Sequence, residues 1–206
     1  MKTRHYLFLL AALSAGCSNS TDNGGTVRPP DQLNFLTLAL TAPALCSNSV
    51  TFEATKGVTA EAALQFPEAG EPADCSGGTE DFVRLKIDAQ SLKQLPDGTP
   101  LQDGDKVTIT MTWVGSDTVM VQLEPTGLVF NPAKPAELNI EYEQVSDDLD
   151  HDGSVTQADT TIENEMGLWR QPTLVDPFTL IGSVKFEDSN EMEAKLNGFS
   201  RYAIAY

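Results

Sequence analysis

Residues 106–113 read KVTITMTW and alternate apolar with polar side chains. Val107, Ile109, Met111 and Trp113 fall on one side of an extended chain, and three threonines fall on the other. A period of two with β-branched residues is typical of a strand that buries one face. We therefore expect Lys106–Trp113 to be a strand of an antiparallel sheet with Trp113 in the core.

The same alternation recurs on both sides of this stretch, with Gly, Pro, Asp and Asn between the runs. No segment shows a long period of 3.6 residues. The pattern predicts an all-β fold, an antiparallel β-sandwich with at most short helices. Residues 32–206 are long enough for one such domain or two small ones. The predicted strands are Leu33–Thr41, Val50–Ala54, Phe82–Asp88, Val119–Leu123, Leu138–Tyr142, Leu180–Phe186, Met192–Leu196 and a last one with Tyr202, Ile204 and Tyr206 on one face, while Ala60–Phe66 fits a strand or a short helix.

The second half carries a family signature. Residues 124–130 read EPTGLVF and are followed by Pro135 and Leu138–Tyr142, and residues 199–204 read FSRYAI. This resembles the β-sandwich domain found in zonula occludens proteins, netrin receptors, ankyrins and many bacterial envelope proteins. Trp169 lies where that family often has a tryptophan, and we expect it to pack beneath the loop described below or to stand free. The resemblance covers residues 95–206.

Some proteins of that family cut their own chain between the Phe and Ser of the last motif. The serine attacks the preceding carbonyl, and a histidine before the Phe helps to move the proton. Here Gly198 occupies the histidine position, while Ser200 is present. We predict no self-cleavage, with Phe199 in the core and Ser200 at a strand end.

One stretch interrupts the strands with acidic residues. Residues 148–159 read DLDHDGSVTQAD, with carboxylates at loop positions one, three, five and twelve and glycine at six. This is the ligand spacing of an EF-hand-type calcium loop, inserted here into the sandwich. An acidic, solvated turn is the alternative. Thr156 would bind the ion directly or through a water molecule, and Ser154 would bind it through its backbone carbonyl. Val155 would pack against the core and hold the loop in place. The predicted Ca²⁺ ligands are Asp148, Asp150, Asp152, Ser154, Thr156 and Asp159.

Threonine at the ninth place and aspartate at the last resemble the dockerin variant of this loop. Dockerins have two such loops and the present chain has one, so a cohesin partner is not implied. A single loop predicts weak binding, with a dissociation constant of about 10⁻⁵–10⁻³ M, which suits extracellular calcium.

The N-terminus predicts export and a lipid anchor. Lys2 and Arg4 precede the apolar run Tyr6–Leu13, which is too short to span a bilayer. Leu13-Ser14-Ala15-Gly16-Cys17 resembles a bacterial lipobox, with residues 1–16 as signal peptide and Cys17 as the lipidated residue. The alternative is a secretory signal with an incidental cysteine. Ser18 favours the outer membrane, and residues 17–31 would form a flexible tether.

Charge and cysteines narrow the class of protein. The formal charge is −17, and loss of Lys2 and Arg4 with the predicted signal peptide, which holds no acid, leaves it near −19. Such a chain repels nucleic acid and favours cations and basic partners. Cys46 and Cys75 remain, and in an oxidising envelope we expect a disulfide rather than two free thiols.

The residue inventory argues against an enzyme. The chain has two histidines, His5 in the predicted signal peptide and His151 inside the acidic loop, and it has no GxSxG and no glycine-rich phosphate loop. We expect a calcium-binding, non-catalytic lipoprotein of the bacterial cell envelope, acting as a structural or binding module for a polysaccharide or an envelope protein. The alternatives are a calcium-responsive assembly or sensing component and a glycan-acting enzyme that uses paired carboxylates.

Overall fold

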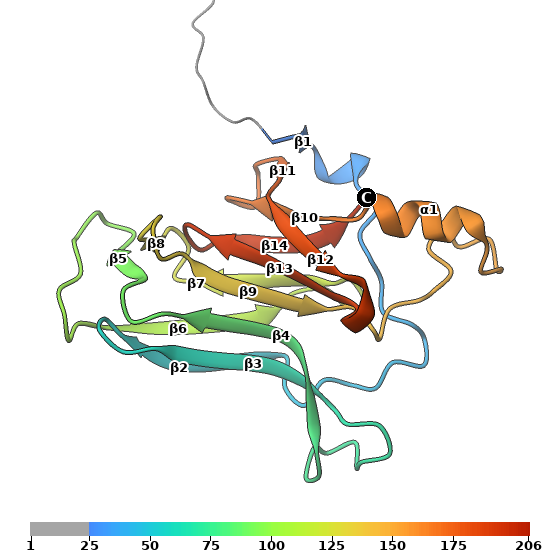
Figure 1. The fold of residues 1–206 in the computed structure, drawn as a ribbon, viewed down its shortest axis with the longest axis horizontal. Helices are drawn as coiled ribbons and strands as arrows, with labels where there is room; N and C mark the ends of the chain where they lie inside the picture. The colour runs from blue at the N-terminus through green and yellow to red at the C-terminus, as the bar shows by residue number, and fades with distance from the viewer. Residues whose placement is uncertain (1–24) are drawn as a thin grey trace, which may run out of the picture.

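The protein is a β-sandwich of two stacked antiparallel sheets in a computed structural model that describes residues 25–206 (Figure 1). The predicted signal peptide, the lipidation site Cys17 and most of the tether lie outside the described residues. Every strand pairing within the two sheets is antiparallel, as the alternating pattern predicts. The predicted all-β sandwich is therefore confirmed.

The larger sheet has seven strands and contains the stretch KVTITMTW. That stretch forms β6 with its predicted bounds, and Val107, Ile109 and Met111 are buried against the other sheet. Its strands, in spatial order, are β1 (Val27–Arg28), β11 (Phe178–Leu180), β10 (Gly167–Gln171), β14 (Arg201–Ala205), β7 (Met120–Glu124), β6 (Lys106–Trp113) and β2 (Ser49–Thr55).

The smaller sheet has five strands, and a two-stranded ribbon lies beside it. Residues 60–66, for which the sequence left strand and helix open, form a strand that continues to Pro67. The strands of the smaller sheet are β12 (Ser183–Phe186), β13 (Glu191–Leu196), β9 (Ala136–Glu141), β4 (Thr79–Ile87) and β3 (Ala60–Pro67). The ribbon pairs β5 (Leu92–Gln94) with β8 (Val129–Phe130), and the short helices are η1 (Pro30–Gln32), α1 (Gln157–Glu165) and η2 (Glu187–Ser189).

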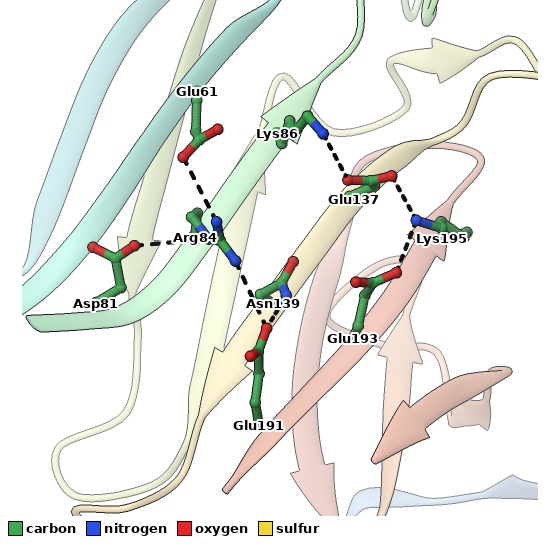
Figure 2. A network of polar contacts seen from close by, with 9 residues as sticks. All are labelled: Glu61, Asp81, Arg84, Lys86, Glu137, Asn139, Glu191, Glu193 and Lys195. Atoms are coloured by element: carbon green, nitrogen blue, oxygen red, sulfur yellow. Dashed lines mark hydrogen bonds and ion pairs between the residues drawn. The ribbon is translucent and has the colours of Figure 1, made fainter. Parts of the chain in front are cut away.

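The outer face of the smaller sheet is a charged network (Figure 2). Arg84 on β4 lies 3.9 Å from Glu61 and 3.8 Å from Glu191, and Glu137 on β9 pairs with Lys86 and Lys195. These side chains come from four neighbouring strands, β3, β4, β9 and β13. Residues two apart along one strand share a face, so Arg84 and Lys86 lie on the same side of the sheet. Each exposed pair contributes about 0–1 kcal/mol, so the network favours solubility more than stability.

The larger sheet, in contrast, is covered on both faces near its C-terminal strand. Tyr202 and Ile204 join the main core, while Ala203 and Ala205 join a second cluster with Trp169 and Leu33. The expectation of one polar face is therefore wrong for β14. Trp169 is buried in this second cluster, which holds no residue of the acidic loop, and its indole donates to the carbonyl of Ala205 at 3.0 Å. Trp169 therefore packs neither beneath that loop nor free in solvent.

Two predicted strands are wrong in detail. Leu33–Thr41 is an extended segment with isolated bridges, because it crosses from the second cluster to the main core and pairs with a different partner at each step. Leu180–Phe186 is split into β11 and β12, which belong to different sheets. An alternating pattern predicts extension, but it does not say which neighbour a strand pairs with.

The predicted disulfide is present. Cys46 and Cys75 are bonded with their Cα atoms 5.7 Å apart, and they join the segment before β2 to the loop between β3 and β4. Trp113 is partly buried, with its ring edge-on to Phe82 and its indole nitrogen donating to the carbonyl of Thr118.

Candidate metal centre

The acidic loop lies at one end of the sandwich, between β9 and α1, beside the C-terminus (Figure 1). A strand leads into it, as the sequence predicts. Leu149, the second residue of the loop, is buried against the main core, and its carbonyl accepts a hydrogen bond from the hydroxyl of Tyr206. The loop is therefore fixed to the body of the fold at its beginning.

The backbone of the loop turns around its own carboxylates. Asp148 accepts hydrogen bonds from the N–H groups of Asp152 at 3.1 Å and Gly153 at 2.9 Å. Asp150 accepts from Asp152 at 3.1 Å, and Asp152 accepts from Ser154 at 2.9 Å. His151 and Gly153 have φ of 59° and 88°, and the left-handed turn at Gly153 suits a residue without Cβ.

Three of the predicted ligands converge. One carboxylate oxygen from each of Asp148, Asp150 and Asp152 lies within 4.8 Å of the other two. Ligands on opposite sides of a calcium ion are about 4.6–5.2 Å apart, so a single ion can touch all three. Carboxylate oxygens are the ligands that hard cations prefer, and none of the three forms an ion pair within residues 25–206. The cluster is therefore a candidate site for a hard divalent cation.

Asp159, the predicted last ligand, is not part of that cluster. Its side chain is 3% exposed and accepts from the N–H groups of Thr156 at 2.7 Å, Leu149 at 2.7 Å and Asp150 at 3.2 Å. The bond from Thr156, with those from Asp150 and Leu149, lowers the pKa of Asp159 against the opposing effect of burial. Asp159 thus ties the start of the loop to the start of α1.

Thr156 caps α1. Its hydroxyl accepts from the N–H of Ala158 at 3.1 Å, and with Asp159 at the third helical position it forms a capping box. The hydroxyl is therefore already used as a helix cap in this conformation, and the predicted contact of Thr156 with the ion stays a prediction. The carbonyl ligand predicted from Ser154 stays a prediction as well.

The anchoring residue of the loop is not the one that the sequence indicated. Val155 is 68% exposed, so the expectation that it pins the loop is wrong. Leu149 takes that role, since its side chain is buried in the main core. Helix α1 was also missed, since Ile162 is the only large apolar residue in it. The spacing of Thr156 and Asp159, three residues apart, is the signal that predicts its start.

The Phe199-Ser200 bond lies in the core. Phe199 is buried with its ring edge-on to Phe130, as expected, and the Ser200 hydroxyl accepts from the Nε–H of Arg170 at 2.9 Å. The carbonyl of Phe199 accepts from the N–H of Gly127 at 3.0 Å. The side chain that contacts the Ser200 hydroxyl is thus a cation, the guanidinium of Arg170. The predicted lack of self-cleavage stays a prediction.

Within residues 25–206, no helix is both long and apolar enough to cross a lipid bilayer. Comparisons with protein-family models, with curated proteins and with solved structures found no match for this chain.

Proposed function

We propose that the protein is a lipid-anchored, calcium-binding module of the bacterial cell envelope, with a structural or binding role and no catalysis. The observation that supports it most is the convergence of the Asp148, Asp150 and Asp152 carboxylates within 4.8 Å at one end of a rigid sandwich. Three like charges this close repel one another, and a divalent cation offsets that repulsion.

The contacts around the loop support a mainly structural ion. Leu149 is already buried, Asp159 already holds the loop to α1, and the turn at Gly153 is already made. Calcium would therefore bind a loop whose shape is largely set, and it would stabilise that shape. A ligand that binds only the folded state at 10–100 times its dissociation constant stabilises it by about 1.4–2.7 kcal/mol.

A calcium-responsive role is the second candidate, and the position of Asp159 favours it. Asp159 lies outside the cluster, so its carboxylate would have to move toward the ion to complete the ligand set. That movement would disturb its bonds from Leu149 and Thr156, which join the loop to α1, and a partner could detect the change.

Anchoring and location rest on the sequence and on one feature of the fold. The stretch Leu13–Cys17 has the lipobox pattern, and the Cys46–Cys75 disulfide is typical of proteins in oxidising compartments. The non-catalytic role rests on the residue inventory, because His151 is the one histidine beyond the predicted signal peptide.

Calcium titration followed by thermal unfolding tests this function. We expect millimolar calcium to raise the melting temperature, and Asp150→Asn, which removes one carboxylate of the cluster, to reduce that rise strongly. Asp103→Asn is the matched control, because Asp103 lies in an exposed turn away from the loop. A melting temperature that is indifferent to calcium, or equal responses of both variants, contradicts the proposal. A large change in circular dichroism on titration would favour the responsive role instead.

A further inference from the structure

A row of polar side chains crosses the outer face of the larger sheet. Strand pairing places Ser49 beside Thr112, Thr112 beside Gln122, Gln122 beside Arg201 and Arg201 beside Gln171. Neighbouring strands are about 4.8 Å apart, so the row across β2, β6, β7, β14 and β10 is about 19 Å long. Directly paired residues share a face, and the residues next to them in sequence, such as Met111 and Tyr202, are buried in the main core.

The row ends in a cleft of about 330 Å³ between the end of β7 and the loop that joins β10 to β11. This volume lies within the range of about 300–1,000 Å³ that is usual for small-molecule sites. Its polar lining mixes amides, hydroxyls, one guanidinium and one carboxylate: Gln122, Gln171, Thr126, Thr173, Arg201 and Glu124. Such groups offer both donors and acceptors.

One buried acceptor in this cleft has no partner. Gln171 is 3% exposed, and its Nε2 donates to the carbonyls of Asp176 at 2.9 Å and Leu174 at 3.4 Å. Its Oε1 accepts no hydrogen bond from any described residue. Buried acceptors are nearly always satisfied, so this one is an exception, but the oxygen itself is buried and is not a contact open to a ligand in this conformation.

One cation in the cleft has no counter-ion. The Nε of Arg201 donates to Gln122 at 3.4 Å, and no carboxylate of the described chain lies within ion-pair distance of its guanidinium. Partial burial of the guanidinium lowers the pKa of Arg201. The carboxylate of Glu124, which also lines the cleft, already accepts from the backbone and hydroxyl of Thr126 and from the amide of Gln122. A planar guanidinium in this state matches a carboxylate that comes with a ligand.

The rest of the row suits sugar hydroxyls. Ser49 and Thr112 lie 3.0 Å apart through their hydroxyl oxygens, and Thr51 and Thr110 lie 2.9 Å apart on the next rung. Each hydroxyl can donate or accept, which is also the property of a sugar hydroxyl. An extended peptide binds instead by adding a strand to a free sheet edge. This row lies on the face of a sheet in which β6, β7, β14 and β10 are paired on both sides.

We infer that the outer face of the larger sheet binds an acidic oligosaccharide, with a uronic acid carboxylate on Arg201 and the chain running along the row toward Ser49. This inference rests on the binding-module function proposed above and names its ligand class.

Isothermal titration with a hyaluronan oligosaccharide, in which uronic acid alternates with a neutral sugar, tests the inference on the folded protein. Saturable binding is expected, and Arg201→Gln should weaken it at least about tenfold, the scale of a charge-assisted bidentate contact. Arg84→Gln is the matched control, since it makes the same substitution on the outer face of the other sheet and should leave the affinity unchanged. The Arg201 Nε–H signal should shift during the titration in nuclear magnetic resonance spectra.

Three results would overturn the inference: no saturable binding to the wild type, equal binding by the neutral chitin oligosaccharide, or equal affinity of wild type and Arg201→Gln. Equal binding of a polyglutamate peptide would assign the cleft to carboxylates of any source and would also overturn it. Each titration is run with calcium and with a chelator. A calcium-induced rise in melting temperature without sugar binding refutes this inference alone, whereas sugar binding without that rise refutes the calcium proposal alone.

Discussion

At the scale of single residues, two glutamates on one strand have opposite electrostatic surroundings. Glu137 and Glu141 both lie on β9 of the smaller sheet. Hydrogen bonds from Lys195 and Lys86 lower the pKa of Glu137, although burial opposes them (Figure 2). Burial raises the pKa of Glu141 to about 7, with further contributions from Asp81, Glu191 and Glu80. An ionised glutamate thus stabilises the fold at position 137 and destabilises it at position 141.

Glu141 makes the free energy of unfolding fall as pH rises. Its pKa is higher in the folded than in the unfolded chain, so the folded state holds the proton more tightly between pH 4.5 and about 7. The stability that this proton provides is present below that window and is lost through it. We expect Glu141→Gln to be more stable than the wild type at pH 8 by about 1 kcal/mol, after allowance for solvent screening, and to be no more stable at pH 4. Urea denaturation at several pH values measures this.

Glu137→Gln is the matched comparison on the same strand, and its sign is opposite. The lowered pKa of Glu137 means that its contribution is present near neutral pH and is lost as pH falls through the folded-state value. The variant should therefore be less stable than the wild type at pH 7, with the difference shrinking in acid. If both variants showed the same pH dependence, the assignment of the two surroundings would be wrong.

At the scale of elements, α1 owes its position to its ends rather than to its composition. It is nine residues long, and within it only Ile162 packs against the main core as a large apolar residue. Helices of this length are marginal in water without tertiary contacts or caps. The capping box of Thr156 and Asp159 provides the first turn with hydrogen-bond acceptors and joins it to the acidic loop.

Thr156→Ala removes the cap hydroxyl and should lower stability by about 1 kcal/mol, because one N–H of the first turn loses its acceptor. Since α1 and the loop share Asp159, the variant should also bind calcium more weakly. Thr160→Ala, an exposed position inside the same helix, should change both quantities little. Chemical denaturation and calcium titration of the two variants provide the test, and a Thr156→Ala protein as stable as Thr160→Ala would speak against the capping role.

At the scale of the whole molecule, the disulfide joins segments that adjoin strands of different sheets. Cys46 lies before β2 and Cys75 between β3 and β4, with a sequence separation of 29. The backbone N–H of Cys46 also donates to the carbonyl of Gln65 on β3 at 2.8 Å. The disulfide closes a loop in the unfolded chain, which lowers the conformational entropy of the unfolded state and so makes that state less favourable.

Replacement of both cysteines by serine should lower the free energy of unfolding by about 3–4 kcal/mol on the chain-entropy account. The fold should survive, because the main core does not include the disulfide. Denaturation of the double variant, compared with the wild type with and without reductant, measures the loss. Reduced wild type and double variant should agree, and a reduced wild type as stable as the oxidised protein would refute the expectation.

Attachment to the membrane is also a property of the whole molecule. If Cys17 carries acyl chains, Cys17→Ser should move the protein from the membrane fraction to the soluble fraction and abolish labelling with a clickable fatty acid. Two or more acyl chains anchor stably, since each buried CH₂ contributes about 0.8 kcal/mol. The Cys46→Ser, Cys75→Ser protein is the control and should keep its label. A Cys17→Ser protein that still labels would show that the lipid is elsewhere or that the signal is an ordinary one.

The sequence by itself determined that the fold is all-β, where most of its longer strands lie, and that Cys46 and Cys75 are expected to pair, although it left residues 60–66 open between strand and helix. These features depend on local alternation, turn residues and composition, which a chain carries without its partners. It also marked Asp148, Asp150 and Asp152, because the ligands of a short loop are close in sequence. Tertiary structure decided that residues 180–186 divide between two sheets, that Leu149 rather than Val155 is buried, and that Asp159 faces backbone N–H groups. It also decided the polar row from Ser49 to Gln171, whose members are far apart in sequence and meet only through strand pairing. Pairing and burial depend on which surfaces meet, and no local pattern contains that information.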